Sequence, residues 1–67
     1  MTVFINNQPQ NLPDEVENIE QLLEHLKVKR GGTAVAINNK LVLNKKWQST
    51  RLQEKDNITL ITAAFGG

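Results

Sequence analysis

The chain has 67 residues, a net charge of +1, one histidine and no cysteine. This length limits the protein to one small domain over residues 1–67, and the composition excludes disulfides and Cys/His metal sites as supports for its single modest core. The near-neutral charge does not favour binding to nucleic acid or to a membrane surface, and no apolar run approaches the ~20 residues of a membrane span, so we expect a cytoplasmic protein.

The first predicted element is a β-hairpin. Residues 2–6 alternate in a strand pattern that places Phe4 on the face opposite its two aliphatic neighbours. The Asn6-Asn7 pair tolerates positive φ and predicts a tight turn, after which residues 8–12 return as a second strand. Because Pro9 cannot donate a ladder hydrogen bond, we expect this second strand at an edge of the sheet.

A connection over residues 13–17 leads to a helix predicted over residues 18–29. Asn18 has the side chain of an N-cap, and Gln21 is its expected capping-box partner. Acidic residues crowd the start of this segment and basic residues its end, as the helix dipole favours. Gly31-Gly32 is expected to supply the left-handed stop. Four aliphatic residues at helical spacing form one apolar stripe: Ile19, Leu22, Leu23 and Leu26.

Three further strands are predicted after the helix. Residues 33–38 alternate between branched aliphatic residues and alanines, and an Asn-Asn turn then leads to a short strand over residues 40–43. Residues 44–50 are polar around Trp47, and Arg51-Leu52 is expected to pair briefly. A turn over residues 54–57 precedes the last strand, residues 58–63.

This order predicts an α+β fold in which one main helix covers one face of a mixed four- to five-stranded sheet. Placing the last strand beside the first and parallel to it brings the most apolar strands to the centre and leaves the strand with Pro9 outside. That arrangement is the β-grasp, or ubiquitin-like, two-layer roll. Residues 64–67 would then form a flexible C-terminal tail.

Residues for catalysis are scarce. The chain contains one serine, Ser49, one histidine, His25, and no cysteine or tyrosine. A nucleophile and a base would have to converge in space, and His25 is expected on the helix surface instead. Gly31-Gly32 precedes a strand, which is the wrong order for a phosphate-binding loop. We therefore expect no enzymatic activity, no metal site and no stably bound cofactor.

The C-terminal Gly66-Gly67 pair is the feature that chemistry favours. At an average glycine usage of ~7%, such a pair arises by chance in about 0.5% of chains. Glycine has no Cβ, so the last residues could lie extended in a narrow channel with an unhindered carboxylate at the end. The alternative is an ordinary frayed chain end.

Several stretches spread over the whole chain together carry a family resemblance. They are Val3-Phe4-Ile5-Asn6, Leu22-Leu23, Ala34-Val35-Ala36-Ile37-Asn38-Asn39, Val42 with Trp47, Leu52, Asp56 and Gly66-Gly67. With them the chain resembles the thiamine-biosynthesis sulfur carrier proteins, relatives of the molybdopterin synthase small subunit and of ubiquitin. Leu43 and Asn44 depart from the Pro and Arg that are usual in the family, and Lys55 stands where Gly is usual.

The resemblance implies a mechanism in which the protein is a carrier. A ubiquitin-activating-like adenylyltransferase would use MgATP to adenylate the Gly67 carboxylate, with Gly66 and Phe65 threading into that enzyme. A cysteine desulfurase or another sulfurtransferase would supply the sulfur of a C-terminal thiocarboxylate, and thiazole synthase would consume it. The carrier itself is expected to be a monomer when free.

Partners also need a surface to hold. Phe4 and Ile61 are expected on the open face of the sheet, where an exposed apolar pair would form a docking patch. Trp47 is expected either to pack against its loop or to contact a partner. Three other functions stay open on the residues alone: a sister carrier for molybdopterin synthesis or tRNA thiolation, a protein modifier conjugated through Gly67, and a non-carrier β-grasp module.

Overall fold

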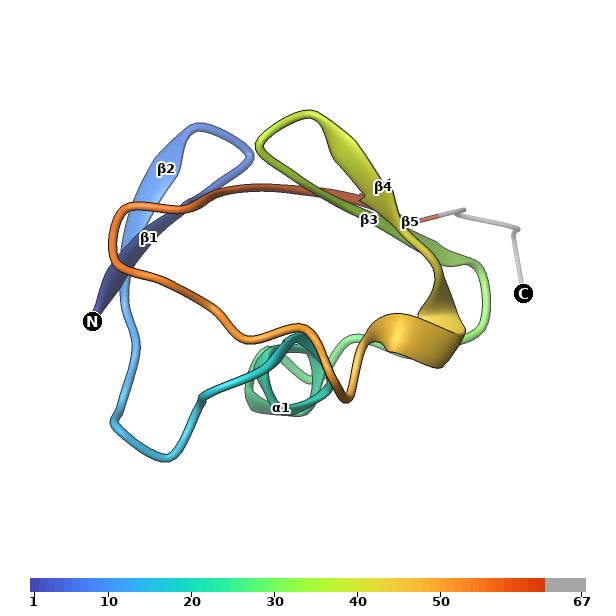
Figure 1. The fold of residues 1–67 in the computed structure, drawn as a ribbon, viewed down its shortest axis with the longest axis horizontal. Helices are drawn as coiled ribbons and strands as arrows, with labels where there is room; N and C mark the ends of the chain where they lie inside the picture. Colours follow the sequence, from blue (N-terminus) through green and yellow to red (C-terminus); the bar gives the residue numbers. More distant parts are fainter. Residues whose placement is uncertain (63–67) are drawn as a thin grey trace.

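The computed structural model describes residues 1–62, and Figure 1 shows them as a sheet with one helix packed beneath it. The sheet has five strands in the order β2-β1-β5-β3-β4. The elements are β1 (Thr2–Ile5), β2 (Gln8–Asn11), α1 (Ile19–His25), β3 (Thr33–Ile37), β4 (Lys40–Val42), the 3₁₀ turn η1 (Asn44–Lys46) and β5 (Asn57–Thr62).

The predicted β-grasp fold is confirmed by this topology. β1 and β5 are the parallel pair, with Ile5 opposite Ile58, and every other neighbouring pair of strands in the sheet is antiparallel. β2 lies at one edge with Pro9 opposite Phe4, as the missing N–H of proline requires. The last strand therefore lies in the middle of the sheet, held by a neighbour on each side.

Two short turns join the hairpins. Asn6 and Asn7 have φ values of 50° and 69°, and Asn38 and Asn39 have 51° and 70°. Positive φ at both central residues is the signature of a type I′ turn, whose twist matches that of the strands it joins. Asparagine tolerates this left-handed backbone better than most residues, so both predicted turns are confirmed with their mechanism.

The start of α1 agrees with the capping prediction. Asn18 Oδ1 accepts a hydrogen bond from the Gln21 backbone N–H at 2.8 Å, and Gln21 Oε1 accepts one from the Asn18 N–H at 3.3 Å. This reciprocal pair is a capping box, which satisfies two of the N–H groups that a helix start leaves without partners. Arg51 bridges to Asn18, so the brief pairing expected of the 51–52 segment is made with the approach to the helix.

The predicted end of the helix is wrong. α1 stops at His25, and Lys27, with a φ of 59°, is the left-handed residue that ends it. The Lys27 N–H bonds to the Glu24 carbonyl at 3.1 Å, and the Val28 N–H bonds to the Leu23 carbonyl at 2.9 Å. This is a Schellman motif, which usually has glycine at its left-handed position.

The glycine pair expected to stop the helix has another use. Gly32 has a φ of 80° and lies in a turn that the Thr33 N–H closes on the Arg30 carbonyl at 3.3 Å. A positive φ at the third residue of a turn calls for glycine, because a side chain there would be strained. The pair therefore begins the approach to β3 instead of ending α1.

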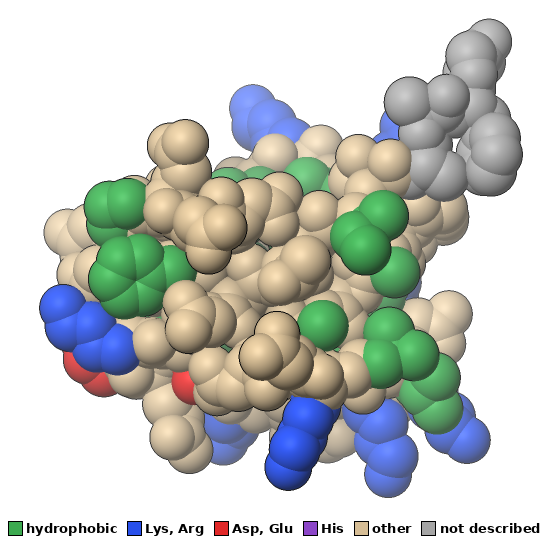
Figure 2. Space-filling model, turned by 90° about the horizontal axis from the view of Figure 1, so that it is seen from above, with side chains coloured by type: hydrophobic (Ala, Val, Ile, Leu, Met, Phe, Trp, Pro, Cys, Tyr) green, Lys and Arg blue, Asp and Glu red, His purple; other side chains and the backbone are tan. Residues whose placement is uncertain are grey.

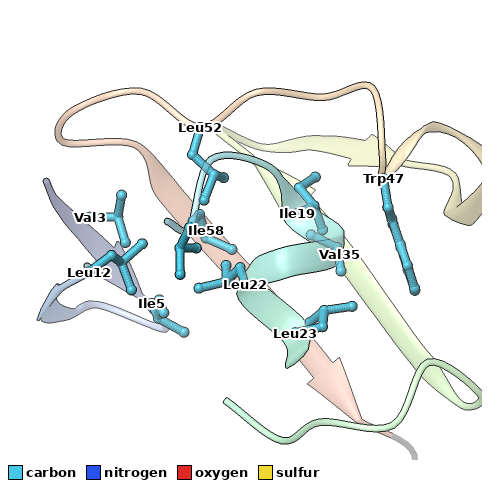
Figure 3. Close-up of a cluster of buried hydrophobic side chains, with 11 residues drawn as sticks. Val3, Ile5, Leu12, Ile19, Leu22, Leu23, Val35, Trp47, Leu52 and Ile58 are labelled. Atoms are coloured by element: carbon cyan, nitrogen blue, oxygen red, sulfur yellow. The ribbon is translucent and has the colours of Figure 1, made fainter. Parts of the chain in front are cut away.

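The core lies between the sheet and the helix (Figure 3). The predicted apolar stripe of α1 is confirmed, since its first three members are almost fully buried and Leu26 is partly buried. Four residues outside the regular elements complete the core from the connecting segments. They are Leu12, Val16, Trp47 and Leu52. The connections are therefore held by burial, which matters in a domain this small.

Candidate functional site

The candidate site begins where β5 ends. β5 runs through the centre of the sheet to Thr62, which lies opposite Thr33 of β3. The chain then leads to the predicted carrier residues. Phe65, Gly66 and Gly67, like the whole predicted tail over residues 64–67, lie outside the described residues, so their roles stay predictions.

Two asparagine side chains form hydrogen bonds with the backbone of β5, one at the start of the strand and one nearer its end. Asn38 Oδ1 accepts from the Asn57 N–H at 3.1 Å, at the start of the strand. Asn6 Oδ1 accepts from the Leu60 N–H at 2.9 Å, and Asn6 Nδ2 donates to the Leu60 carbonyl at 3.2 Å. Each of these asparagines is the first residue of a hairpin turn, so both hairpins hold the central strand with a side chain as well as with backbone.

Asp56 fixes the entry to β5. Its carboxylate is buried and accepts from the Gln53 N–H at 2.8 Å and from Asn38 Nδ2 at 3.2 Å. Its backbone carbonyl accepts from the Phe4 N–H at 2.8 Å. The preceding residue, Lys55, has a φ of 69°, which explains why glycine would suit this position. In the sequence, Asp56 was notable only as part of the family resemblance. Its contacts show that it joins the start of β5 to β1 and to the turn after β3.

The open face of the sheet carries the predicted docking residues, but it does not bring them together. Phe4 lies level with Asn57, four residues before Ile61, so about 13 Å of strand separates them. Phe4 is half-buried, with Lys55 Nζ 6.0 Å from its ring centroid, and Ile61 is 63% exposed. The expected single Phe4–Ile61 patch is therefore wrong, because the two side chains belong to different parts of the face.

Ile61 has other apolar neighbours. Ala34 lies opposite Ile61, and Leu41, which is 67% exposed, lies opposite Ala36. We call these four residues, Ala34, Ala36, Leu41 and Ile61, the apolar strip. Figure 2 looks on to the open face and shows its hydrophobic side chains in separate groups towards the two ends of the sheet. The strip crosses β4, β3 and β5 and includes Ile61, the residue next to Thr62 at the end of β5.

Trp47 does not belong to this surface. Its side chain is 1% exposed and packs in the core, and its Nε1 donates to the Val42 carbonyl at 2.9 Å. The Arg30 guanidinium covers the ring at 5.4 Å from its centroid. The expectation that Trp47 contacts a partner is wrong, because its side chain is buried beneath Arg30 and is not accessible to another protein.

The described residues offer no assembled catalytic or metal-binding group. His25 is exposed at the end of α1, and the Ser49 hydroxyl donates to the Lys46 carbonyl in its own turn at 3.2 Å. Over residues 1–62, no three His, Asp or Glu side chains gather in a way that could hold a metal ion. The same span contains no helix long and apolar enough to cross a membrane.

The comparisons with known proteins agree with this architecture. A model of the ThiS family matches residues 3–67. The sulfur carrier protein ThiS of Escherichia coli (strain K12) is 33% identical over 51 residues, which cover 76% of this chain and 77% of that protein.

Two solved structures from Geobacter metallireducens share the fold. The crystal structure of its thiamine biosynthesis protein ThiS superposes with a TM-score of 0.83 at 22% identity and covers 100% of both chains. The solution structure of a thiamine biosynthesis protein from the same organism has a TM-score of 0.82 at 22% identity, covering 100% of this chain and 88% of that one. At 22% identity these two matches show that the fold is shared.

Proposed function

This chain belongs to the ThiS family, and on that premise we propose that it is a sulfur carrier of thiamine biosynthesis whose carrying group is the carboxylate of Gly67. The observation that carries the proposal is the reach of the family match, which extends through residue 67 and so includes the Gly66-Gly67 pair. The fold supports it, because the central strand β5 leads directly into the segment that ends in this pair.

The chemistry needs a partner because a carboxylate is a poor electrophile. In the proposed first step, a carboxylate oxygen of Gly67 attacks the α-phosphorus of MgATP on an adenylyltransferase of the ubiquitin-activating type, and pyrophosphate leaves. In the second, the outer sulfur of a persulfide on a cysteine desulfurase or another sulfurtransferase attacks the acyl carbon and displaces AMP. A thiol of the sulfur-donating partner then cleaves the S–S bond of the acyl disulfide, which leaves a thiocarboxylate on Gly67 and a disulfide on the partner. Thiazole synthase would then take the sulfur from Gly67. The chain is a co-substrate in this scheme, and ATP and magnesium belong to the partner.

Gly66 and Phe65 are proposed to thread into the partner together with Gly67. Because Gly66 has no Cβ, a narrow channel in the partner could close around its backbone without having to accommodate a side chain.

The proposed adenylation is tested by ATP–pyrophosphate exchange on the activating enzyme. Exchange should depend on the carrier and should disappear when Gly67 is deleted. A carrier with Gln8→Ala on the exposed edge strand β2 is the matched control and should support full exchange. Exchange that persists without Gly67 would contradict the assignment of the carrying group.

We also propose that the activating enzyme docks on the apolar strip. The strip lies next to the end of β5, and three lysines, Lys40, Lys45 and Lys46, lie in β4 and η1 beside it. No acidic residue occurs between Thr33 and Arg51, so this side of the domain suits a partner with an apolar centre and acidic groups around it. Phe4 with Lys55 would provide a second, separate contact.

Substitution of the strip should weaken docking without unfolding the domain. Ile61→Ser removes an exposed side chain, so the free energy of unfolding should change by no more than about 0.5 kcal/mol. Affinity for the adenylyltransferase, measured by calorimetry, should fall about tenfold, as expected for an apolar contact in an interface. Phe4→Ala should weaken binding as well. Unchanged affinity in both variants would remove the open face as the docking surface.

A further inference from the structure

The Asn6 side chain satisfies backbone groups of β5 that the turn of the first hairpin would leave without a partner. β1 ends at Ile5 and turns away, whereas its parallel neighbour β5 continues to Thr62. Leu60 would therefore face the β1 side with its N–H and C=O without a strand partner. The Asn6 amide takes both, accepting from the N–H at 2.9 Å and donating to the C=O at 3.2 Å. A primary amide has the same donor and acceptor pair as a peptide group, so Asn6 extends β1 by one rung.

The contact of the Asn6 side chain with Leu60 determines how far along β5 the strand has a hydrogen-bonded partner on both sides. The Asn6 backbone N–H also donates to the Ile58 carbonyl at 2.9 Å, and the side chain carries the pairing on to Leu60. Beyond Leu60, the strand pairs with β3 alone, through Ala34 opposite Ile61 and Thr33 opposite Thr62. Among the described residues, Asn6 is therefore the last contact on the β1 side before the chain leads to Gly67.

We propose that Asn6 is a positioning residue for the activation of Gly67, an inference that rests on the function proposed above. Five residues follow Thr62, the last of them Gly67, and five residues span at most about 18 Å. Because this segment is short, the position and direction of the chain at Thr62 determine where the Gly67 carboxylate can reach. If residues 60–62 separated from the sheet, Gly67 would be presented correctly in only a fraction of molecules, and the apparent affinity for the activating enzyme would fall to that fraction of its full value.

The turn alone does not explain the use of asparagine. A φ of 50° at this position is served better by glycine, which adopts it without strain. Asn6→Gly therefore keeps the turn and removes only the side-chain rung. Asn38→Gly is the matched control, since Asn38 has the same place in its own turn, a φ of 51°, and contacts at the start of β5 instead of its end.

Hydrogen exchange followed by NMR on the full chain tests the rung directly. In Asn6→Gly the Leu60 amide should exchange at least about tenfold faster, because the Asn6 side chain is its acceptor and its surroundings are exposed to water. The Ile58 amide should keep its protection. In Asn38→Gly the Asn57 amide should lose protection while the Leu60 amide keeps it. Unchanged exchange at Leu60 in Asn6→Gly would overturn the proposal.

Steady-state activation then tests positioning. With the adenylyltransferase and MgATP, Asn6→Gly should raise the KM for the carrier about three- to tenfold and leave kcat within about twofold, because docked molecules react normally. Asn6→Asp keeps the acceptor for the Leu60 N–H, so it should retain the Leu60 protection and raise KM less. If Asn6→Gly does not fold, Asn6→Asp and Asn6→Ala compared with each other decide the same question.

The outcomes separate this inference from the function on which it rests. A wild-type chain that is not adenylated at all would contradict the proposed function, while the exchange data on Leu60 would still stand. A wild-type chain that is adenylated, together with an Asn6→Gly chain that loses Leu60 protection but keeps its KM, would overturn the positioning role alone. An equal rise of KM in Asn38→Gly would also overturn it, because the effect would then be general loosening.

Discussion

At the scale of single residues, Trp47 shows what a linear pattern does not reveal. It lies in a polar stretch without periodicity, so no spacing rule identifies it as a core residue. In the folded chain its ring is 1% exposed, beneath an Arg30 guanidinium that is itself paired with Glu20. The capping pair of Asn18 and Gln21 was predictable because its partners are three residues apart. The contact of Asn6 with Leu60 was not, since it joins distant parts of the chain.

Trp47→Phe should therefore lower stability and leave partner affinity unchanged. The change removes the hydrogen bond to the Val42 carbonyl and leaves space beside a buried ring, at a cost of about 1–3 kcal/mol. Urea unfolding should show a lower midpoint, compared with Leu43→Ala, whose side chain is 53% exposed and should cost little. A normal midpoint combined with weakened adenylyltransferase binding would return Trp47 to an interface.

At the scale of elements, the spacing of apolar residues and the two Asn-Asn turns predicted every strand and the helix. Within residues 1–62 the strand ends differ from the prediction by one residue at most. The helix end differs more, because the stop is Lys27, a residue that carries no left-handed signal. Leu26 fits the apolar stripe and the basic residues fit a helix C-terminus, so periodicity and charge both argued for a longer helix. Only the hydrogen bonds of the Schellman motif reveal the early end.

Lys27→Gly should stabilise the domain. A left-handed lysine is strained by about 1–2 kcal/mol, and glycine removes this strain while adding some freedom to the unfolded chain, so the net gain should be about 1 kcal/mol. In a domain of this size Tm should rise by about 4–8 °C. Lys29→Gly is the control, since the φ of Lys29 is not positive, and it should lower Tm. A Tm for Lys27→Gly at or below the wild-type value would contradict the strain argument.

At the scale of the whole molecule, the placement of the last strand beside the first followed from their apolar content, and this pairing makes β5, the strand before the proposed carrier segment, a central strand. The relative register of β1 and β5 did not follow, because parallel pairing across most of the chain has no local sequence signal. That register separates Phe4 from Ile61 and groups Ile61 with Leu41 and the alanines of β3. The Gly66-Gly67 pair was visible only as sequence, and the family match now supports its use.

The central claim is that Gly67 carries sulfur, and intact mass spectrometry tests it most directly. The full chain is incubated with MgATP, the activating enzyme and a sulfur source, with a chain lacking Gly67 as the control. We predict a mass gain equal to the replacement of one oxygen by one sulfur, present only when ATP and Gly67 are both present. An unchanged mass under conditions in which the activating enzyme is active, or the same gain without Gly67, would contradict the account.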